Sequence, residues 1–238
     1  MFFDWPDGLA WRMLERTTFR LRRRKFDFFM ETARPGPEES LLDVGVAGFI
    51  GRATDFLEMW YPYRRRITAI GIEKPAMYRA FRDAYPEVRV MVGDGAMMPF
   101  RDGSFDLLFS NAVLEHAGDR ERQKKFVHEC VRVAGRGFIT TPSYWFPLES
   151  HTLLPFVHYL PYNIKRRIYG WAGKGFWADP ELLNLLTEDE FVGMFPPGVR
   201  TVVSRQRLMG ITATIWVYFE HAGNPDSPAS GGRTGSGQ

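Results

Sequence analysis

Short apolar runs alternate with stretches of helical character through most of the chain. Five of these runs lie at residues 41–44, 67–72, 88–92, 106–110 and 137–141. Near-continuous apolar runs separated by helices are typical of a parallel β-sheet that is covered on both faces. Such sheets bind ligands at the carboxyl ends of their strands, so the residues that follow each run are the first candidates for function.

Both ends of the chain and one internal segment depart from this rhythm. Residues 1–37 predict a basic, amphipathic helical segment that packs on the domain as a lid, with an anionic membrane surface as the alternative partner. Residues 143–197 are rich in aromatic residues and proline and contain no clean strand, so we interpret them as an insertion that covers the active site. Residues 223–238 consist largely of Gly, Ser and Pro and predict a disordered tail. The main domain then spans residues 38–222.

Composition narrows the class of protein but not its function. The 238 residues are 45% hydrophobic and 25% charged, which is typical of a globular protein. A net charge of +3 is too small to argue for nucleic acid. One cysteine and five histidines form no zinc motif, and neither a secretory signal nor an apolar run of about 20 residues is present. We therefore expect a cytoplasmic enzyme, with association at a membrane surface as a second possibility.

Small and acidic residues follow the first three runs. The first run leads into the Gly-rich turn 43–48, where a ligand can approach the backbone closely. Glu73 ends the second run, and a carboxylate there can accept both hydroxyls of a ribose, although it can also simply stabilise the next helix. Asp94 follows the third run between two glycines and can accept the exocyclic amine of an adenine.

Residues 93–116 are the most specific part of the sequence. They contain the motifs GDGAMMPF, DGSFD and VLEH. With these motifs, residues 41–142 resemble the class I S-adenosylmethionine (SAM)-dependent methyltransferases of the type 11 kind. The resemblance implies an α/β fold with a Rossmann-like, doubly wound sheet of seven strands, mostly parallel with an antiparallel last strand, and helices on both faces. The β-branched runs at residues 201–204 and 211–218 predict the closing antiparallel pair.

The resemblance also implies a set of SAM contacts. Asp43 and Gly45 would lie beside the methionyl group, with Glu73 on the ribose and Asp94 on the adenine. The complete expected set, which adds backbone groups of the Gly-rich turn, of the adenine edge and of the fourth strand end, is Asp43, Gly45, Ala47, Gly48, Glu73, Asp94, Gly95, Ala96 and Asn111. The first motif departs from the family pattern, because Ala47 and Phe49 stand where glycines are usual. We expect this departure to affect cofactor affinity rather than the fold.

Methyl transfer from a sulfonium mainly requires alignment of the nucleophile with the methyl carbon, and a base if the acceptor is a hydroxyl. His151 with Glu149, in the loop after the fifth run, is the preferred base candidate. His116 competes for this role, although its Glu-His pair is commonly structural in the family, and His158 is expected to pack. No metal is predicted, because Ala112 replaces the first of the acids through which similar quinone-pathway O-methyltransferases bind one.

The aromatic segment and the basic N-terminal helix favour a small-molecule, glycan or lipid-linked acceptor that is methylated on oxygen. An RNA or protein methyltransferase is one alternative, although no appended RNA-binding module is visible. A non-catalytic SAM-fold binding protein is another, but a dead site need not keep three separate carboxylates. A nicotinamide-dependent dehydrogenase would leave Asp94 and the motifs up to His116 unexplained.

Overall fold

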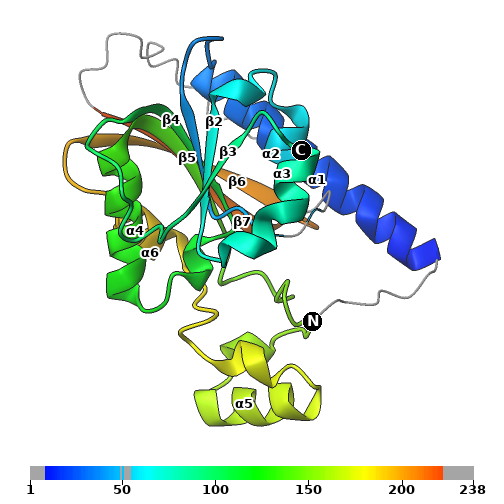
Figure 1. Ribbon diagram of the computed structural model, residues 1–238. Coiled ribbons are helices and arrows are strands. Elements are labelled where there is room, and N and C mark those ends of the chain that lie inside the picture. Colours follow the sequence, from blue (N-terminus) through cyan, green and yellow to red (C-terminus); the bar gives the residue numbers. More distant parts are fainter. Residues whose placement is uncertain (1–8, 49, 51–54, 222–238) are drawn as a thin grey trace.

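The computed structural model describes residues 9–48, 50 and 55–221 (Figure 1). Within these residues, one seven-stranded sheet has the order β3-β2-β1-β4-β5-β7-β6. The strands are β1 (Leu41–Val44), β2 (Ile67–Gly71), β3 (Arg89–Val92), β4 (Phe105–Asn111), β5 (Ala134–Pro142), β6 (Val199–Leu208) and β7 (Ile211–His221). Strands β1 to β5 pair in parallel, whereas β7 runs antiparallel to both β5 and β6. The predicted fold class is confirmed.

Helices cover both faces of this sheet (Figure 1). The α-helices are α1 (Leu9–Ala33), α2 (Phe56–Trp60), α3 (Arg79–Ala84), α4 (Arg120–Val133), α5 (Tyr162–Trp171) and α6 (Glu188–Val192). Side chains alternate across each strand, so Leu41 packs with α1, α2 and α3 while Leu42 and Val44 pack with α4 and α6. No helix in the described ranges is long and apolar enough to cross a bilayer.

Helix α1 packs on the sheet through an aromatic face. Phe26 and Phe29 are buried in the core, and Phe29 lies edge-on to Phe109 of β4 with ring centroids 5.1 Å apart. The side-chain amide of Gln206 donates a 2.7 Å hydrogen bond to the carbonyl of Leu21, which ties the helix to β6. These contacts hold the C-terminal half of α1 on the sheet.

The DGSFD motif has a structural role at the amino edge of the sheet, opposite the carboxyl ends of the parallel strands. Gly103 adopts a φ of 61° and donates a 2.8 Å backbone hydrogen bond to Arg132, whose guanidinium pairs with Asp102 at 2.7 Å. Asp106 accepts hydrogen bonds from the backbone and the hydroxyl of Ser40, at 2.8 and 2.7 Å. These contacts fix the start of β4 against α4 and β1, which explains why a turn without chemistry has a specific sequence.

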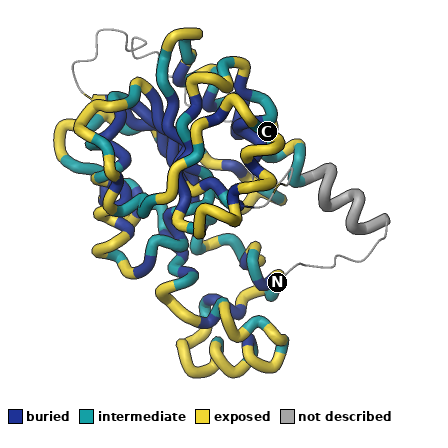
Figure 2. The backbone as a smooth tube through the Cα atoms, viewed as in Figure 1, coloured by how far each residue is buried: buried dark blue, intermediate teal, exposed yellow. Residues whose placement is uncertain are grey.

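The aromatic segment after β5 leaves the sheet at the carboxyl edge of the strands. Its helix α5 stands apart from the sheet in Figure 1 and is mostly exposed in Figure 2. Tyr144 donates a 2.9 Å backbone hydrogen bond to Leu186, which closes the segment at its base. Phe49 and the tail 223–238 lie outside the described residues, so the expectations about them stay predictions.

Candidate functional site

The end of β1 requires a glycine. Gly45 has a φ of 100°, and a Cβ atom built on it would lie 2.1 Å from Cγ2 of Val113. Its backbone N–H donates a 2.8 Å hydrogen bond to the carbonyl of Ile70 in β2. Gly45 thus lets the segment after β4 cross directly over the end of β1, at the crevice where the strand order reverses.

A buried carboxyl pair lies beneath this turn. Asp43 is 8% exposed, and Glu58 of α2 is fully buried beside it. Burial and the adjacent charge of Asp43 raise the pKa of Glu58 well above its usual range. The pKa of Asp43 rises to about 6, mainly through burial, with a hydrogen bond to Glu58 opposing the rise and the charge of Asp55 adding to it. Burial and their mutual proximity therefore make it unfavourable for both carboxyls of the pair to be charged at once.

Glu73 lies at the end of β2, as predicted, and faces the Gly-rich turn. Its Oε2 accepts a 2.6 Å hydrogen bond from the backbone N–H of Gly48. A Cβ atom on Gly48 would lie 2.3 Å from this oxygen, so the contact requires glycine at that position. The backbone N–H of Glu73 donates in turn to the hydroxyl of Tyr78, at 3.1 Å. The structure therefore brings Glu73 and Gly48 together.

Asp94 follows β3 and is held by two contacts. Its Oδ1 accepts a 2.9 Å hydrogen bond from the backbone N–H of Ala96, and its Oδ2 pairs with the guanidinium of Arg122 on α4. Two large apolar side chains lie exposed near these acids, Ile72 at 71% and Met97 at 76%. Ile72 directly precedes Glu73, and Met97 follows Asp94 in the same turn. Both side chains can therefore offer apolar contact to a flat aromatic ring. Gly95 is packed closely, because a Cβ atom there would lie 2.4 Å from the Phe126 ring.

Asn111, at the end of β4, has a partner that the sequence did not reveal. Lys25 of α1 is 6% exposed, and its Nζ lies 2.5 Å from Oδ1 of Asn111 and 3.3 Å from Oγ1 of Thr140. The pKa of Lys25 is lowered to about 7, mainly by burial, with the charge of Arg22 adding to the decrease and the charge of Glu115 opposing it. A buried amine with a labile proton thus lies at the carboxyl ends of β4 and β5.

Substituting Lys25 with methionine is expected to change how stability depends on pH. The folded-state pKa of about 7 lies below the usual 10.5, so between these values the unfolded chain binds more protons and wild-type stability rises with pH. The wild-type gain attributable to Lys25 is about 2 kcal/mol between pH 7 and pH 9. Urea unfolding at both pH values checks this, because the Lys25→Met variant lacks this contribution.

The exposed Lys124 of α4 supplies the matched control. Lys124→Met should leave the pH dependence of the unfolding free energy as in the wild type. Equal pH dependence in wild type and Lys25→Met would show that Lys25 keeps an ordinary pKa in the folded protein.

A histidine cluster lies at the same edge, beside the end of β4. Nε2 of His116 lies 3.0 Å from Nε2 of His151, and Nδ1 of His151 lies 2.7 Å from Oε1 of Glu149. Burial opposes ionisation of Glu149, but its hydrogen bonds with His151 lower its pKa to about 2. The pKa of His151 is raised, because the hydrogen bond and charge of Glu149 outweigh burial. The structure thus brings together all three residues predicted for catalysis.

Two further residues complete this cluster. Glu115 is fully buried; its Oε2 accepts a 3.2 Å hydrogen bond from Thr141, and its Oε1 lies 4.0 Å from Nε2 of His116. The ring of Trp177, from the 3-10 turn Gly175–Ala178, lies over His151 with centroids 4.6 Å apart. The aromatic segment therefore contributes Glu149, His151 and Trp177 to a site whose other half belongs to the end of β4.

His158 takes no part in this cluster. Its Nε2 lies 3.1 Å from the carbonyl of Tyr144, and its ring packs against Tyr159 with centroids 4.0 Å apart. Burial lowers its pKa, which fits a neutral, packed side chain. The geometry agrees with the packing role expected for it.

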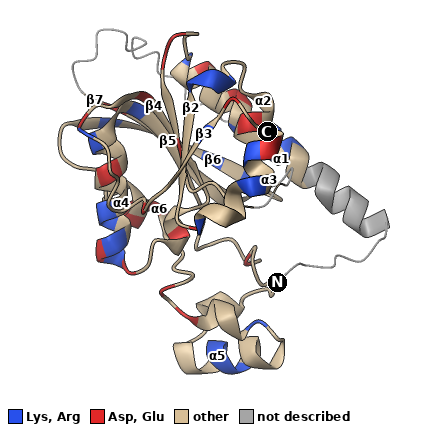
Figure 3. Cartoon of the chain, viewed as in Figure 1, with Lys and Arg blue, Asp and Glu red and all other residues tan. Residues whose placement is uncertain are grey.

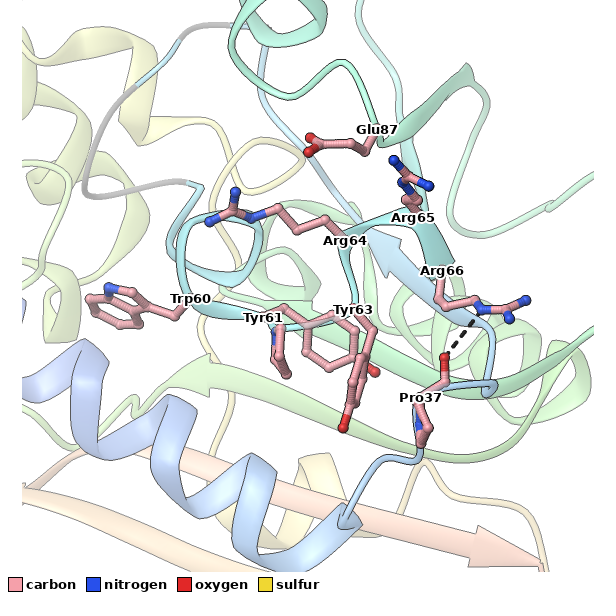
Figure 4. Close-up of a pocket in the computed structure, with 9 residues that line it drawn as sticks. Pro37, Trp60, Tyr61, Tyr63, Arg64, Arg65, Arg66 and Glu87 are labelled. Carbon is pink, nitrogen blue, oxygen red and sulfur yellow. Dashed lines mark hydrogen bonds between the residues drawn. The ribbon is translucent and has the colours of Figure 1, made fainter.

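A separate cavity of about 560 Å³ lies at the opposite, amino edge of the sheet (Figure 4). Pro37, Arg66 and Glu87, which line it, precede β1, β2 and β3 respectively, and Arg66 donates a 3.2 Å hydrogen bond to the carbonyl of Pro37. None of the residues predicted to bind cofactor or to act in catalysis lines it. We therefore place the functional site at the carboxyl edge.

Comparison with known proteins finds similarity to methyltransferases over part of the chain. Residues 42–139 match the family described as "Methyltransferase domain". A probable S-adenosylmethionine-dependent methyltransferase of Mycobacterium tuberculosis is 34% identical over 82 residues, which are 33% of this chain and 28% of that protein. Ajmaline N-methyltransferase of Rauvolfia serpentina is 50% identical over 46 residues, 19% of this chain and 15% of that protein. The chain thus spans well under half of the length of these relatives.

A solved structure covers more of the chain. Magnesium protoporphyrin IX methyltransferase from Synechocystis PCC 6803, with bound S-adenosylhomocysteine (SAH), aligns with a TM-score of 0.59 over 92% of this chain and 90% of that chain. The sequence identity is 11%, so this likeness concerns the fold. The structural likeness therefore extends well beyond residues 42–139.

Proposed function

We propose that this chain transfers a methyl group from SAM to a hydroxyl of a small-molecule, glycan or lipid-linked acceptor, which the match of residues 42–139 to the methyltransferase domain supports. The proposal depends on one observation: the acids at the strand ends and the histidine cluster lie at the same edge of the sheet. Asp43, Glu73 and Asp94 end three adjacent strands, and the histidine cluster lies beside the end of β4.

The proposed cofactor contacts follow from the polar groups at these strand ends. Asp43, at the end of β1 beside the Gly-rich turn, offers carboxylate oxygens to the amino group at the methionyl end of SAM. Gly48 donates its hydrogen bond to Oε2 of Glu73, which leaves Oε1 available to accept hydrogen bonds from the ribose hydroxyls. Asp94 receives the adenine amine, while Ile72 and Met97 offer apolar contact to the ring. The product would be SAH.

The proposed acceptor chemistry uses the histidine cluster. Nε2 of His151 accepts the proton of the acceptor hydroxyl, and Glu149 stabilises the resulting imidazolium through Nδ1. His116 and the Trp177 ring bound the same space. An amine acceptor would not require such a base, so the cluster favours oxygen over nitrogen.

The charge distribution favours a small or lipid-linked acceptor over RNA. Basic and acidic residues are interspersed on α4, and further basic residues lie on α3 and α5 (Figure 3). RNA recognition usually relies on a basic surface together with exposed stacking bases, and the net charge of this chain is only +3. We therefore propose no nucleic-acid partner.

The proposal is tested by following methyl label from SAM and the formation of SAH. Panels of phenols, sugars, polyprenyl-linked sugars, amines and total RNA serve as acceptors. The expected result is label on a hydroxyl of one of the first three classes. Transfer confined to amines or RNA would overturn the assignment to oxygen, and the absence of SAH with every panel would favour a non-catalytic protein.

A further inference from the structure

The Nε2 atoms of His116 and His151 face one another, and in the neutral imidazoles neither Nε2 carries a hydrogen. Nδ1 of His116 lies 2.7 Å from the carbonyl of Leu182, which can only accept, so this Nδ1 carries the hydrogen. Nδ1 of His151 lies 2.7 Å from the Glu149 carboxylate, which also accepts. A neutral imidazole has one N–H, so both Nε2 atoms present lone pairs across a distance of 3.0 Å.

Two lone pairs at this distance require a cation between them, either a proton or a metal ion. A proton shared by the two Nε2 atoms would give both of them a hydrogen bond, but it would leave Oε1 of the nearby Glu115 without one. Oε1 of Glu115 is completely buried and has no hydrogen-bond partner in the described part of the protein. It lies 4.0 Å from Nε2 of His116, and single donor atoms of Glu115, His116 and His151 all lie within 4.8 Å of one another.

We propose that Glu115, His116 and His151 bind a divalent transition-metal ion of the zinc type, with Glu149 orienting His151 from behind. Two nitrogens bound tetrahedrally to one zinc ion lie about 3.3 Å apart, close to the distance observed between the two Nε2 atoms. A carboxylate behind a ligating histidine is the usual supporting arrangement, and Glu149 occupies that position. Two imidazoles favour zinc or iron over magnesium or calcium, which prefer oxygen ligands.

The site is open on one side. The side chains of His116 and His151 are 31% and 22% exposed, whereas Glu115 and Glu149 are fully buried. Three protein ligands leave a fourth position, which the acceptor oxygen can occupy. The sequence led us to expect no metal because of Ala112; the third ligand instead comes from His151, 35 residues beyond His116. The role toward the acceptor rests on the proposed function, but ion binding itself does not.

An ion and a base would use the same lone pair of His151, so each state of the site excludes the other. Substitution of His151 removes both and cannot distinguish them. The deciding experiment therefore measures ion binding directly, without SAM and without an acceptor.

Calorimetric titration of the full chain with zinc, and separately with magnesium, tests the inference. We expect one zinc site that His116→Ala, His151→Ala and Glu115→Gln each weaken at least tenfold, and that Glu149→Gln weakens roughly 10- to 100-fold. Magnesium should bind far more weakly than zinc. His128→Ala removes an exposed histidine on α4 and should leave zinc affinity unchanged.

Side-chain ¹⁵N spectra give a second readout. Zinc should shift the Nε2 signals of His116 and His151 while their Nδ1–H signals persist, and circular dichroism confirms that each variant is folded. Wild-type zinc affinity equal to that of the folded His116→Ala/His151→Ala double variant would overturn the proposal and leave a shared proton. Methyl transfer is measured separately on chelator-treated protein, in which Nε2 of His151 is free, and its failure there, with zinc binding intact, would count against the proposed function alone.

Discussion

Substituting Gly45 with alanine is expected to lower the free energy of unfolding by about 2–5 kcal/mol. A left-handed backbone conformation costs an L-residue about 1–2 kcal/mol, and Gly45 has a φ of 100°. The added Cβ atom would lie 2.1 Å from Val113, and overpacking of this kind costs about 1–3 kcal/mol more. Equilibrium denaturation in urea checks the sum.

Two other variants separate these contributions. Gly103 also has a positive φ, but nothing lies within 4 Å of a Cβ atom built on it, so Gly103→Ala should show the backbone cost alone. The Gly45→Ala/Val113→Ala double variant should recover part of the loss by relieving the contact. Equal losses for Gly45→Ala and Gly103→Ala would contradict the crossing of the segment after β4 over the end of β1.

Substituting His151 with glutamine is expected to reduce kcat for methyl transfer roughly 100- to 10,000-fold, the usual contribution of a positioned acid–base group. The affinity for SAM should change by less than twofold, because His151 lies in the aromatic segment rather than at the cofactor strand ends. Single-turnover transfer of labelled methyl, with the acceptor identified in the panel screen, measures the effect.

The comparison for this variant is His128→Gln. His128 lies exposed on α4, so kcat should stay at the wild-type value. If His151→Gln keeps more than a tenth of wild-type kcat, the cluster does not assist the chemical step, and a role in positioning the aromatic segment becomes the better account.

The sheet and the strand-end acids could be predicted from sequence because both depend on local patterns. Each of β1 to β5 is an apolar run followed by small or polar residues, and Glu73 and Asp94 sit directly at such boundaries. The VLEH motif likewise placed His116 at the end of β4. The hairpin of β6 and β7 followed from its β-branched residues, although these strands are longer than the runs that predicted them.

Other site residues were missed because their roles depend on contacts that no local pattern records. Lys25 lies in a basic stretch of α1, and the sequence alone suggests a solvent-exposed charge there. Its partner Asn111 is 86 residues away along the chain, so no local pattern indicates their contact. In the sequence Glu58 is one acid in a short helix, and only the structure shows that its burial beside Asp43 raises its pKa. The distance between His116 and His151 is fixed by the path of the aromatic segment, so the sequence suggested two competing bases where the structure has one cluster.

The central claim is that the ends of β1, β2 and β3 bind SAM, and calorimetric titration with SAM and SAH tests it most directly. Glu73→Ala and Asp94→Ala are compared with wild type, and Asp102→Ala, an acid in the structural turn at the opposite edge, serves as the control. The account predicts micromolar binding that the first two variants weaken at least tenfold, equivalent to about 1.4 kcal/mol, and that Asp102→Ala leaves unchanged wherever the protein stays folded. Folded wild-type protein that binds neither SAM nor SAH would contradict it.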